Sequence, residues 1–338
     1  MARYPLPSEI KLPLLITGIA GVSGYNAFRY YHNRYPGQVV GVRRNEYWPL
    51  TGEGIVGCDI TDLPQLTALC QQYHFQTILS CLGNCRLKSC ELDPAMATEI
   101  NVQGIDHLLT ALQSQQNPCP RLVHLSIDLV FSGTRPHGGY CETDTPDPVT
   151  VYGRTMVEGE QIIRQRMPEA TIIRISLPMG PSFSGHAGAI DWIQSRFQKN
   201  KPATLYFDEI RTPQYTDCLN QLTHWLLTHD VPGTYHAGGP RQLSLYEIAQ
   251  IVNRVGGYDP QCLIGCPRID AGPIPPRAGN VTLDSTELQR LLGFAPFDPW
   301  PWGDLYLPTD RQWHQLRDTT IIGSPELLDC VLYNNPNG

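Results

Sequence analysis

The sequence has no run of basic residues and no apolar stretch long enough to cross a bilayer. Lys and Arg number 25 against 32 Asp and Glu, giving a net charge of -7, so we expect neither nucleic acid nor an anionic membrane surface as a partner. Residues 1–11 lack the charged-then-apolar order of a secretory signal. These absences favour a cytoplasmic protein, and the composition, 41% hydrophobic and 17% charged, indicates a globular chain with a large core.

Cysteine spacing typical of a metal site is also absent, although the chain has 11 Cys. Cys81, Cys85 and Cys90 form a CxxxCxxxxC cluster and Cys262 and Cys266 a CxxxC pair, whereas zinc and iron–sulfur ligands usually include CxxC. We expect reduced, mostly buried thiols and no metal. A redox role for the cluster stays open as the alternative.

Short apolar runs alternate with amphipathic stretches through the first half of the chain. This alternation predicts strands at 12–17, 38–42, near 54–57, 77–82, from 122 and at 171–176, separated by helices at 25–35, 62–73, 94–112 and 152–166. Repeated strand–helix units imply a parallel sheet with helices on both faces. The predicted fold class is therefore α/β, a Rossmann-type doubly wound sheet.

The character of the chain changes after Leu177. Two segments rich in Gly and Pro, at 178–186 and 267–279, enclose predicted helices at 189–198, 217–227 and 244–255. We therefore divide the chain into a nucleotide-binding domain at 1–178, to which 211–240 returns, and a smaller substrate-binding lobe at 179–338. The end of this lobe, with its tryptophans, is expected to be a packed C-terminal extension.

A glycine-rich segment, TGIAGVSG at 17–24, directly follows the first predicted strand and opens a helix. Glycines permit a tight turn and let backbone amides approach a diphosphate, whose charge meets the positive end of the helix. This setting predicts a dinucleotide-binding turn rather than a turn without ligand. The residues expected to contact the cofactor there are Gly18, Gly21, Val22, Ser23 and Gly24.

Two arginines stand at the end of the second strand, where an NAD site usually offers a carboxylate to the ribose 2′-hydroxyl. Arg43 and Arg44 suit a 2′-phosphate, which accepts bidentate charge-assisted hydrogen bonds, with a solvated surface pair as the alternative. Asp59, after the third strand, is placed to bond the adenine amino group. The sequence thus predicts NADP(H), with NAD(H) less favoured. Further cofactor contacts are expected at Ile60, Cys81, Leu82, Gly83 and Leu177.

Several later motifs together resemble the extended short-chain dehydrogenase/reductase family. They are LSIDLVFSG (125–133), YGRTMVEGE (152–160), DEIRTP (208–213), GTYHAGGP (233–240) and PRAGNVTLD (276–284). Within that family the chain is similar to RmlD-like dTDP-4-dehydrorhamnose reductases and to the beta subunit of methionine adenosyltransferase. The resemblance implies a nucleotide-sugar pocket between the two lobes, hydride transfer from the nicotinamide to a 4-keto sugar, and Tyr152 as the residue that contacts cofactor and protonates the developing alkoxide.

Two positions depart from the family's catalytic pattern. Met156 stands where active members have a lysine one helical turn after the tyrosine, and Ile127 replaces the serine or threonine that hydrogen-bonds the substrate carbonyl. Arg154 points to another helix face, and Ser126 to the other side of its strand, so neither is a good substitute. We expect the usual reductase step to be strongly suppressed. Two cations after the fourth strand are either partial replacements or surface charges, namely Arg86 and Lys88.

Three residues in the later motifs and loops are candidates for binding the substrate. Arg211 and Arg277 would hold its phosphates or carboxylate, with structural salt bridges as the alternative, and His186 lies in the loop after the sixth strand. His124, on the fifth strand, is expected to be a core histidine with a satisfied hydrogen bond rather than a base.

Two functions stay open at this point. One is an NADP-dependent oxidoreductase that acts on a nucleotide-sugar-type substrate with an altered catalytic set. The other is a catalytically impaired, cofactor-binding regulatory subunit. Either a homodimer or a regulatory partner protein is compatible with the sequence.

Overall fold

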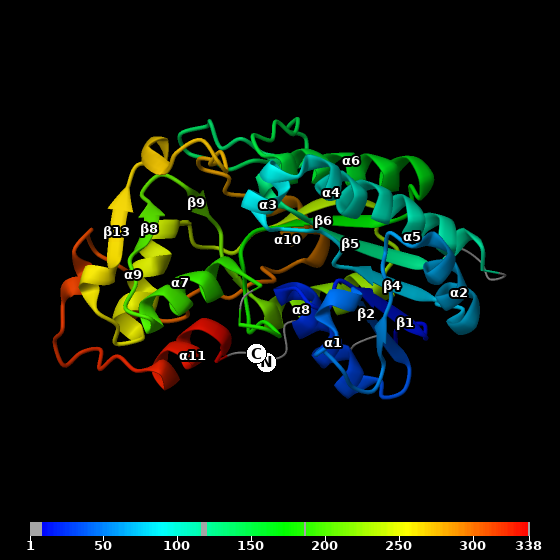
Figure 1. Ribbon diagram of the computed structural model, residues 1–338, viewed down its shortest axis with the longest axis horizontal. Coiled ribbons are helices and arrows are strands. Elements are labelled where there is room, and N and C mark those ends of the chain that lie inside the picture. Colours follow the sequence, from blue (N-terminus) through cyan, green and yellow to red (C-terminus); the bar gives the residue numbers. More distant parts are fainter. Residues whose placement is uncertain (1–8, 116–119, 186, 337–338) are drawn as a thin grey trace.

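A seven-stranded sheet forms the centre of the molecule, which we describe from a computed structural model covering residues 9–115, 120–185 and 187–336. The strand order is β11-β6-β5-β4-β1-β2-β3, and all neighbouring strands are parallel (Figure 1). The strands are β1 Leu14–Thr17, β2 Val39–Arg43, β3 Ile55–Gly57, β4 Thr77–Ser80, β5 Arg121–Ile127, β6 Thr171–Ile175 and β11 Gly233–Ala237. The order runs outward in both directions from β1, so the predicted doubly wound fold is confirmed.

Helices cover both faces of this sheet (Figure 1). One face carries α1 (Val22–Arg34) and α8 (Thr216–Thr228), and the other carries α2 (Leu63–Tyr73), α5 (Gly104–Gln113) and α6 (Val151–Arg166). Neighbouring residues of one strand, such as Leu14 and Leu15, belong to separate hydrophobic cores because successive side chains point to opposite faces. Burial on both faces explains why the strands read as continuous apolar runs.

The helix predicted at 94–112 is not regular. It begins as α4 (Pro94–Thr98), passes through a π-helical turn at Glu99–Gln103 and continues as α5. The wider turn directs the buried Asn101 side chain at its neighbours. Its Oδ1 accepts the Asn84 amide at 2.7 Å, and its Nδ2 donates to Thr155 at 2.9 Å. A π-helical turn thus joins the loop after β4 to α6, which an apolar periodicity cannot reveal.

The smaller lobe lies beside the sheet in Figure 1 and contains short strand pairs and helices. The pairs are β7 (Pro178–Met179) with β10 (Gln214–Tyr215), β8 (Ala203–Tyr206) with β13 (Leu263–Cys266), and β9 (Ile210–Arg211) with β12 (Leu243–Ser244). The lobe's helices are α7 (Ala189–Gln198), α9 (Leu245–Val255) and α11 (Pro325–Tyr333). Helix α3 (Leu87–Leu92) packs on α4 and α6, and α10 (Thr286–Leu292) packs on β11. Trp300 and Trp313 are buried in the core of the lobe, which confirms that the C-terminal segment packs on the lobe.

The chain crosses back to the sheet after β10. Helix α8 packs on α1, and β11 then pairs with β6 along its whole length. The segment 211–240 therefore supplies both a helix and an edge strand to the sheet. The domain boundary at 178 stays a prediction.

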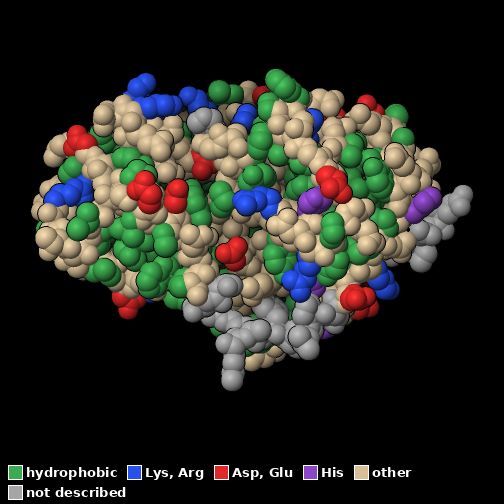
Figure 2. Space-filling view, turned by 90° about the horizontal axis from the view of Figure 1, so that it is seen from below, with side chains coloured by type: hydrophobic (Ala, Val, Ile, Leu, Met, Phe, Trp, Pro, Cys, Tyr) green, Lys and Arg blue, Asp and Glu red, His purple; other side chains and the backbone are tan. Residues whose placement is uncertain are grey.

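On the face drawn in Figure 2, Lys and Arg side chains are interspersed with Asp and Glu rather than gathered in one area. Among the residues that the structure describes, no helix combines the length and apolar character needed to span a membrane.

Candidate functional site

The glycine turn after β1 packs against the end of β4 at backbone distance. Gly18 has a φ of 67°, and a Cβ at this position would lie 2.3 Å from the carbonyl oxygen of Cys81. A Cβ on Gly24 would lie 2.3 Å from the carbonyl oxygen of Gly18. Both positions therefore require glycine, one for its conformation and both for space. The turn brings backbone, rather than side chains, to the carboxyl edge of the sheet.

Helix α1 opens at this turn with no side chain over its first amides. Gly21 is the N-cap, no side chain caps the helix, and its first turn holds no acidic residue. The first turn of a helix leaves N–H groups without helical partners, and the helix dipole makes this end positive. The amides of Val22, Ser23 and Gly24 thus form an end suited to an anion such as a diphosphate.

The two arginines at the end of β2 have different surroundings. Arg43 Nε donates to the Leu50 carbonyl at 2.6 Å, which holds the loop after β2. Arg44 Nε lies 3.6 Å from Asp59 Oδ2 and makes no hydrogen bond to any described residue. Burial disfavours the Asp59 carboxylate, but hydrogen bonds from Thr61 and the Arg44 charge outweigh it and lower the pKa of Asp59. Arg44 therefore lies between two carboxylates, since its Nη1 is also 3.6 Å from Glu46 Oε1.

On the other side of the turn, Tyr152 and Met156 lie against the segment that follows β4. A Cβ on Gly83 would lie 3.2 Å from Met156 Sδ and 4.0 Å from Tyr152 Cε2. Met156 is 3% exposed and Tyr152 5%, and Ile127 packs on the same apolar cluster. Met156 and Ile127 thus surround the tyrosine with apolar groups.

Burial raises the pKa of Tyr152 well above its ordinary value. Cys85 and Asp128 add to this effect, whereas the Arg211 charge opposes it. No described residue forms a hydrogen bond with the Tyr152 hydroxyl. Burial outweighs the Arg211 charge, so the hydroxyl stays protonated at neutral pH and is a weak acid.

Arg211 forms a buried ion pair below this tyrosine. Its Nε donates to Asp128 Oδ2 at 2.7 Å and its Nη2 to Oδ1 at 2.5 Å, and Ser176 donates to Oδ2 at 2.6 Å. Burial disfavours the charged guanidinium, but the Asp128 carboxylate prevails and raises the pKa of Arg211. The pair joins the end of β5 to β9. A substrate anion would have to share Arg211 with this carboxylate.

Arg277 is also paired, but it is less enclosed. Its Nε lies 2.7 Å from Glu209 Oε2, and its guanidinium lies 4.6 Å from the centre of the Tyr206 ring. The Arg277 side chain is 16% exposed, against 6% for Arg211. Both roles in substrate binding stay predictions. His186 falls outside the described residues.

The alternative donors considered in the sequence point elsewhere. Ser126 donates at 2.6 Å to Glu160, which lies eight residues along α6 from Tyr152. Arg154 donates to the Val149 carbonyl at 3.3 Å, away from Tyr152. Arg86 and Lys88 are exposed, and neither is among the main influences on the pKa of Tyr152. His124 Nδ1 lies 3.1 Å from Ser80 Oγ, which confirms the prediction of a core histidine.

A second buried ion pair was not foreseen in the sequence. Glu160 accepts from Arg174 Nε at 2.9 Å and from its Nη2 at 2.7 Å, and Arg174 Nη1 lies 3.3 Å from His236 Nε2. These residues tie α6, β6 and β11 together on the face that carries α6. They come from motifs far apart in the chain, so no local pattern indicated their pairing.

The cysteines of the 81–90 cluster are all free thiols. Burial raises the pKa of Cys81 to about 12 and, with the neighbouring Cys85 and Glu91 charges, that of Cys90 to about 11. Cys90 Sγ donates to the Asn84 carbonyl. Within 9–115, 120–185 and 187–336, no group of three or more His, Cys, Asp and Glu side chains could hold a metal ion.

Comparisons with known proteins agree with this architecture. The family model described as the RmlD substrate binding domain matches residues 12–302. The chain is 27% identical over 291 residues to a dTDP-4-keto-6-deoxy-D-glucose reductase of Streptomyces niveus (85% of this chain, 93% of that protein). It is 24% identical over 318 residues to methionine adenosyltransferase 2 subunit beta of Danio rerio (89% and 93%). A dTDP-4-dehydrorhamnose reductase from Bacillus anthracis, solved in complex with NADP, superposes with a TM-score of 0.70 at 22% identity, covering 86% of this chain and 96% of that one.

Proposed function

The chain belongs to the RmlD substrate binding domain family, and from this we propose that it binds NADP(H) at the carboxyl edge of its sheet and a nucleotide-sugar-type ligand beside it. The resemblance seen in the sequence motifs is thereby confirmed. The single observation that supports cofactor binding most strongly is the glycine turn at Gly18, packed on the β4 backbone below an uncapped helix end. In our proposal the protein is an oxidoreductase with an altered catalytic set.

The cofactor's diphosphate would lie on the amides of Val22, Ser23 and Gly24, with the N-cap Gly21, whose own amide donates to the Gly18 carbonyl, as a further contact. Arg44, whose guanidinium lies 3.6 Å from a carboxylate oxygen of Asp59 and 3.6 Å from one of Glu46, would donate to the 2′-phosphate from the N–H groups that these ion pairs leave available. Arg43 would add charge while it holds its loop. Asp59 would accept from the adenine amino group. When bound, the reduced cofactor supplies a hydride. The remaining proposed contacts are Gly18, Ile60, Cys81, Leu82, Gly83, Tyr152 and Leu177.

The substrate proposal rests on family membership and on two arginines in the smaller lobe. Arg277 is the better candidate for a diphosphate, because it is the more exposed of the two and its single carboxylate partner leaves donors free. Arg211 is enclosed with Asp128 and fits a positioning role near Tyr152 better than a phosphate contact. His186, which lies outside the described residues, stays a proposed contact to the same ligand.

Catalysis by Tyr152 should be weak in the natural chain. A positioned general acid contributes roughly 10²–10⁴-fold to rate, and the loss of one polarising donor costs roughly 10²–10³-fold. Met156 replaces the lysine that would assist the general acid, and Ile127 replaces the serine or threonine that would polarise the substrate carbonyl. The same apolar surroundings favour a second function, a cofactor-loaded regulatory subunit, and one relative over 89% of the chain is named as a subunit of a methionine adenosyltransferase.

Single-turnover NADPH oxidation with dTDP-4-keto-6-deoxy sugars tests the proposal. We expect slow oxidation by the natural chain and an increase of at least about 10²-fold in Ile127→Thr/Met156→Lys, which restores both groups. Leu92→Lys, at an exposed position on α3, is the control for added charge. Fast turnover by the natural chain would contradict the altered-set proposal. No oxidation by either chain, with NADPH still bound, would favour the regulatory function.

A further inference from the structure

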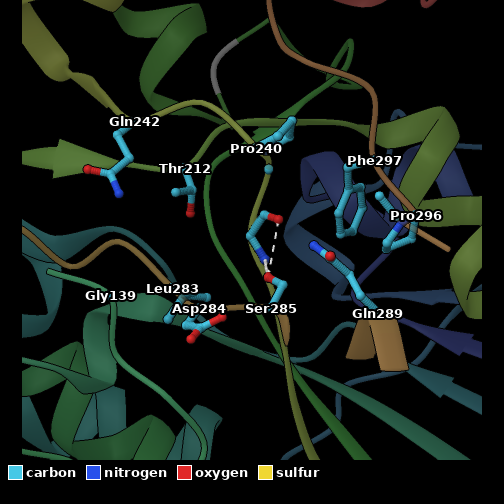
Figure 3. Close-up of a pocket in the computed structure, with 13 residues that line it drawn as sticks. Gly139, Thr212, Pro240, Gln242, Leu283, Asp284, Ser285, Gln289, Pro296 and Phe297 are labelled. Carbon is cyan, nitrogen blue, oxygen red and sulfur yellow. Dashed lines mark hydrogen bonds between the residues drawn. The ribbon is translucent and has the colours of Figure 1, made fainter. Parts of the chain in front are cut away.

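A separate pocket lies at the far edge of the sheet, beyond the end of β11 (Figure 3). Its volume is about 310 Å³. Its walls come mainly from residues 238–242 after β11, from 283–289 at the start of α10, and from 295–297 after that helix. None of the residues proposed to hold NADP(H) or the nucleotide sugar lines it. The pocket is thus distinct from the site described above.

Two glutamines bring free amide groups to this pocket. Gln289 reaches it from α10, and Gln242 from the loop before β12 (Figure 3). Neither side chain forms a hydrogen bond with any residue that the structure describes. Each primary amide offers two donors and an acceptor, which is the pattern that neighbouring hydroxyl groups need.

Asp284 and Thr212 add polar groups to the same walls. Asp284 Oδ1 accepts both bonds from Thr286, at 2.9 and 2.5 Å, so Oδ2 is left for a ligand. Thr212, 2% exposed, has an Oγ1 with no partner in the described structure. A buried hydroxyl without a partner is uncommon and indicates a place where a ligand or water completes the bonding.

Part of the lining is apolar. Phe297 is 5% exposed, and Pro296 is buried beside it (Figure 3). Pro240 and Leu283 add apolar groups elsewhere in the lining, Leu283 beside Asp284 (Figure 3). An aromatic ring with prolines around it offers flat faces on which the C–H groups of a saturated ring can pack.

The charge of the lining residues and the volume of the pocket restrict the class of ligand further. No Lys or Arg lines the pocket, and Asp284 is its one formally charged residue. Phosphates and dinucleotides would meet a carboxylate and no cation, so they are disfavoured. The volume is at the lower end of the roughly 300–1,000 Å³ of small-molecule sites, which suits one ring rather than several.

We propose that this pocket binds a single neutral hexopyranose unit, with Gln242, Gln289 and Asp284 on its hydroxyls and Phe297 against its ring face. The site is independent of the cofactor and nucleotide-sugar proposal. The two sites share one short segment of chain. Thr212 lines this pocket, and it directly follows Arg211, which forms the buried ion pair with Asp128.

Saturation-transfer NMR on the full chain tests this site with glucose, galactose, mannose and rhamnose, and with glucose 6-phosphate as the charged probe. We expect saturable binding of at least one neutral hexose, weaker binding of glucose 6-phosphate, and no displacement by saturating NADPH and UDP. Gln242→Leu and Gln289→Leu should each weaken binding by about fivefold, the effect of one neutral hydrogen bond. Gln72→Leu, at an exposed position of α2, is the matched control.

Three results would overturn the proposal. The first is no saturable binding of any neutral hexose by a chain that still binds NADPH. The second is displacement of the hexose by NADPH or UDP, which would place it in the other cleft. The third is equal affinity in both pocket variants and the Gln72 control. Because both glutamines are exposed, the variants should keep the melting temperature of the natural chain, which thermal unfolding verifies.

Discussion

Replacing Arg211 with methionine should destabilise the protein strongly, because it leaves the Asp128 carboxylate buried without its counter-ion. Asp128 is fully buried, and two of its three side-chain hydrogen bonds come from Arg211, at 2.7 and 2.5 Å, with Ser176 supplying the third. Breaking a buried pair in this way typically costs about 3–5 kcal/mol. We expect a loss of that size in the free energy of unfolding from urea titrations at pH 7.

A second variant separates the pair from its individual charges. Arg211→Met with Asp128→Leu removes both charges, so most of the lost stability should return, since apolar replacements of buried pairs are often near neutral. Arg290→Met is the matched control: Arg290 and Glu287 are both exposed, and such pairs are worth about 0–1 kcal/mol. A loss for Arg211→Met no larger than that of the control would refute the structural role. If that small loss came with weakened UDP binding, Arg211 would instead be a substrate ligand.

Three further outcomes follow from the geometry. Gly18→Ala should lower stability and abolish NADPH binding, because the added Cβ would lie 2.3 Å from the Cys81 carbonyl oxygen. Gly139→Ala is the control: its φ of 68° is similar, but no atom lies within 4 Å of the added Cβ, so NADPH binding should be kept. The free energy of unfolding should fall as pH drops from about 6.5 towards 4. Burial lowers the pKa of His124 to about 4, so in this pH range the unfolded chain binds more protons than the folded one. In urea titrations His124→Asn should make this fall shallower, and an unchanged pH dependence would contradict the role of His124. Mass spectrometry after brief treatment with a thiol reagent should find the exposed Cys330 modified before the half-buried Cys81, whose pKa is about 12. The reverse order would contradict the raised pKa of Cys81.

The sequence predicts most of the sheet because the strands are buried on both faces. Runs such as LLIT at 14–17 and TIIRI at 171–175 are apolar enough to identify strands without homologous sequences. The edge strand β11 is different, because GTYHA at 233–237 is polar and half exposed, and its place in the sheet comes from pairing with β6. The π-helical turn at Glu99–Gln103 likewise depends on Asn101 bonding to Asn84 and Thr155, which are distant in the chain.

The candidate site divides in the same way. The glycine turn is readable because its chemistry is local, with strand, turn and helix in eleven consecutive positions from 14 to 24. The partners of the arginine side chains could not be predicted from the sequence. Arg43 holds the Leu50 carbonyl, Arg211 pairs with Asp128 83 residues away, and Arg277 pairs with Glu209. Sequence motifs thus identified the residue types, whereas long-range folding decided which of their donors stay free.

Isothermal titration of the natural chain and Arg44→Ala with NADPH and NADH tests the central claim most directly. The account predicts that the natural chain binds NADPH at least about tenfold more tightly than NADH, because a hydrogen bond to a charged group is worth about 1.5–3 kcal/mol, and that Arg44→Ala removes most of this difference. Equal affinities for the two cofactors in the natural chain would contradict the role of Arg44. No binding of either would contradict the cofactor site itself.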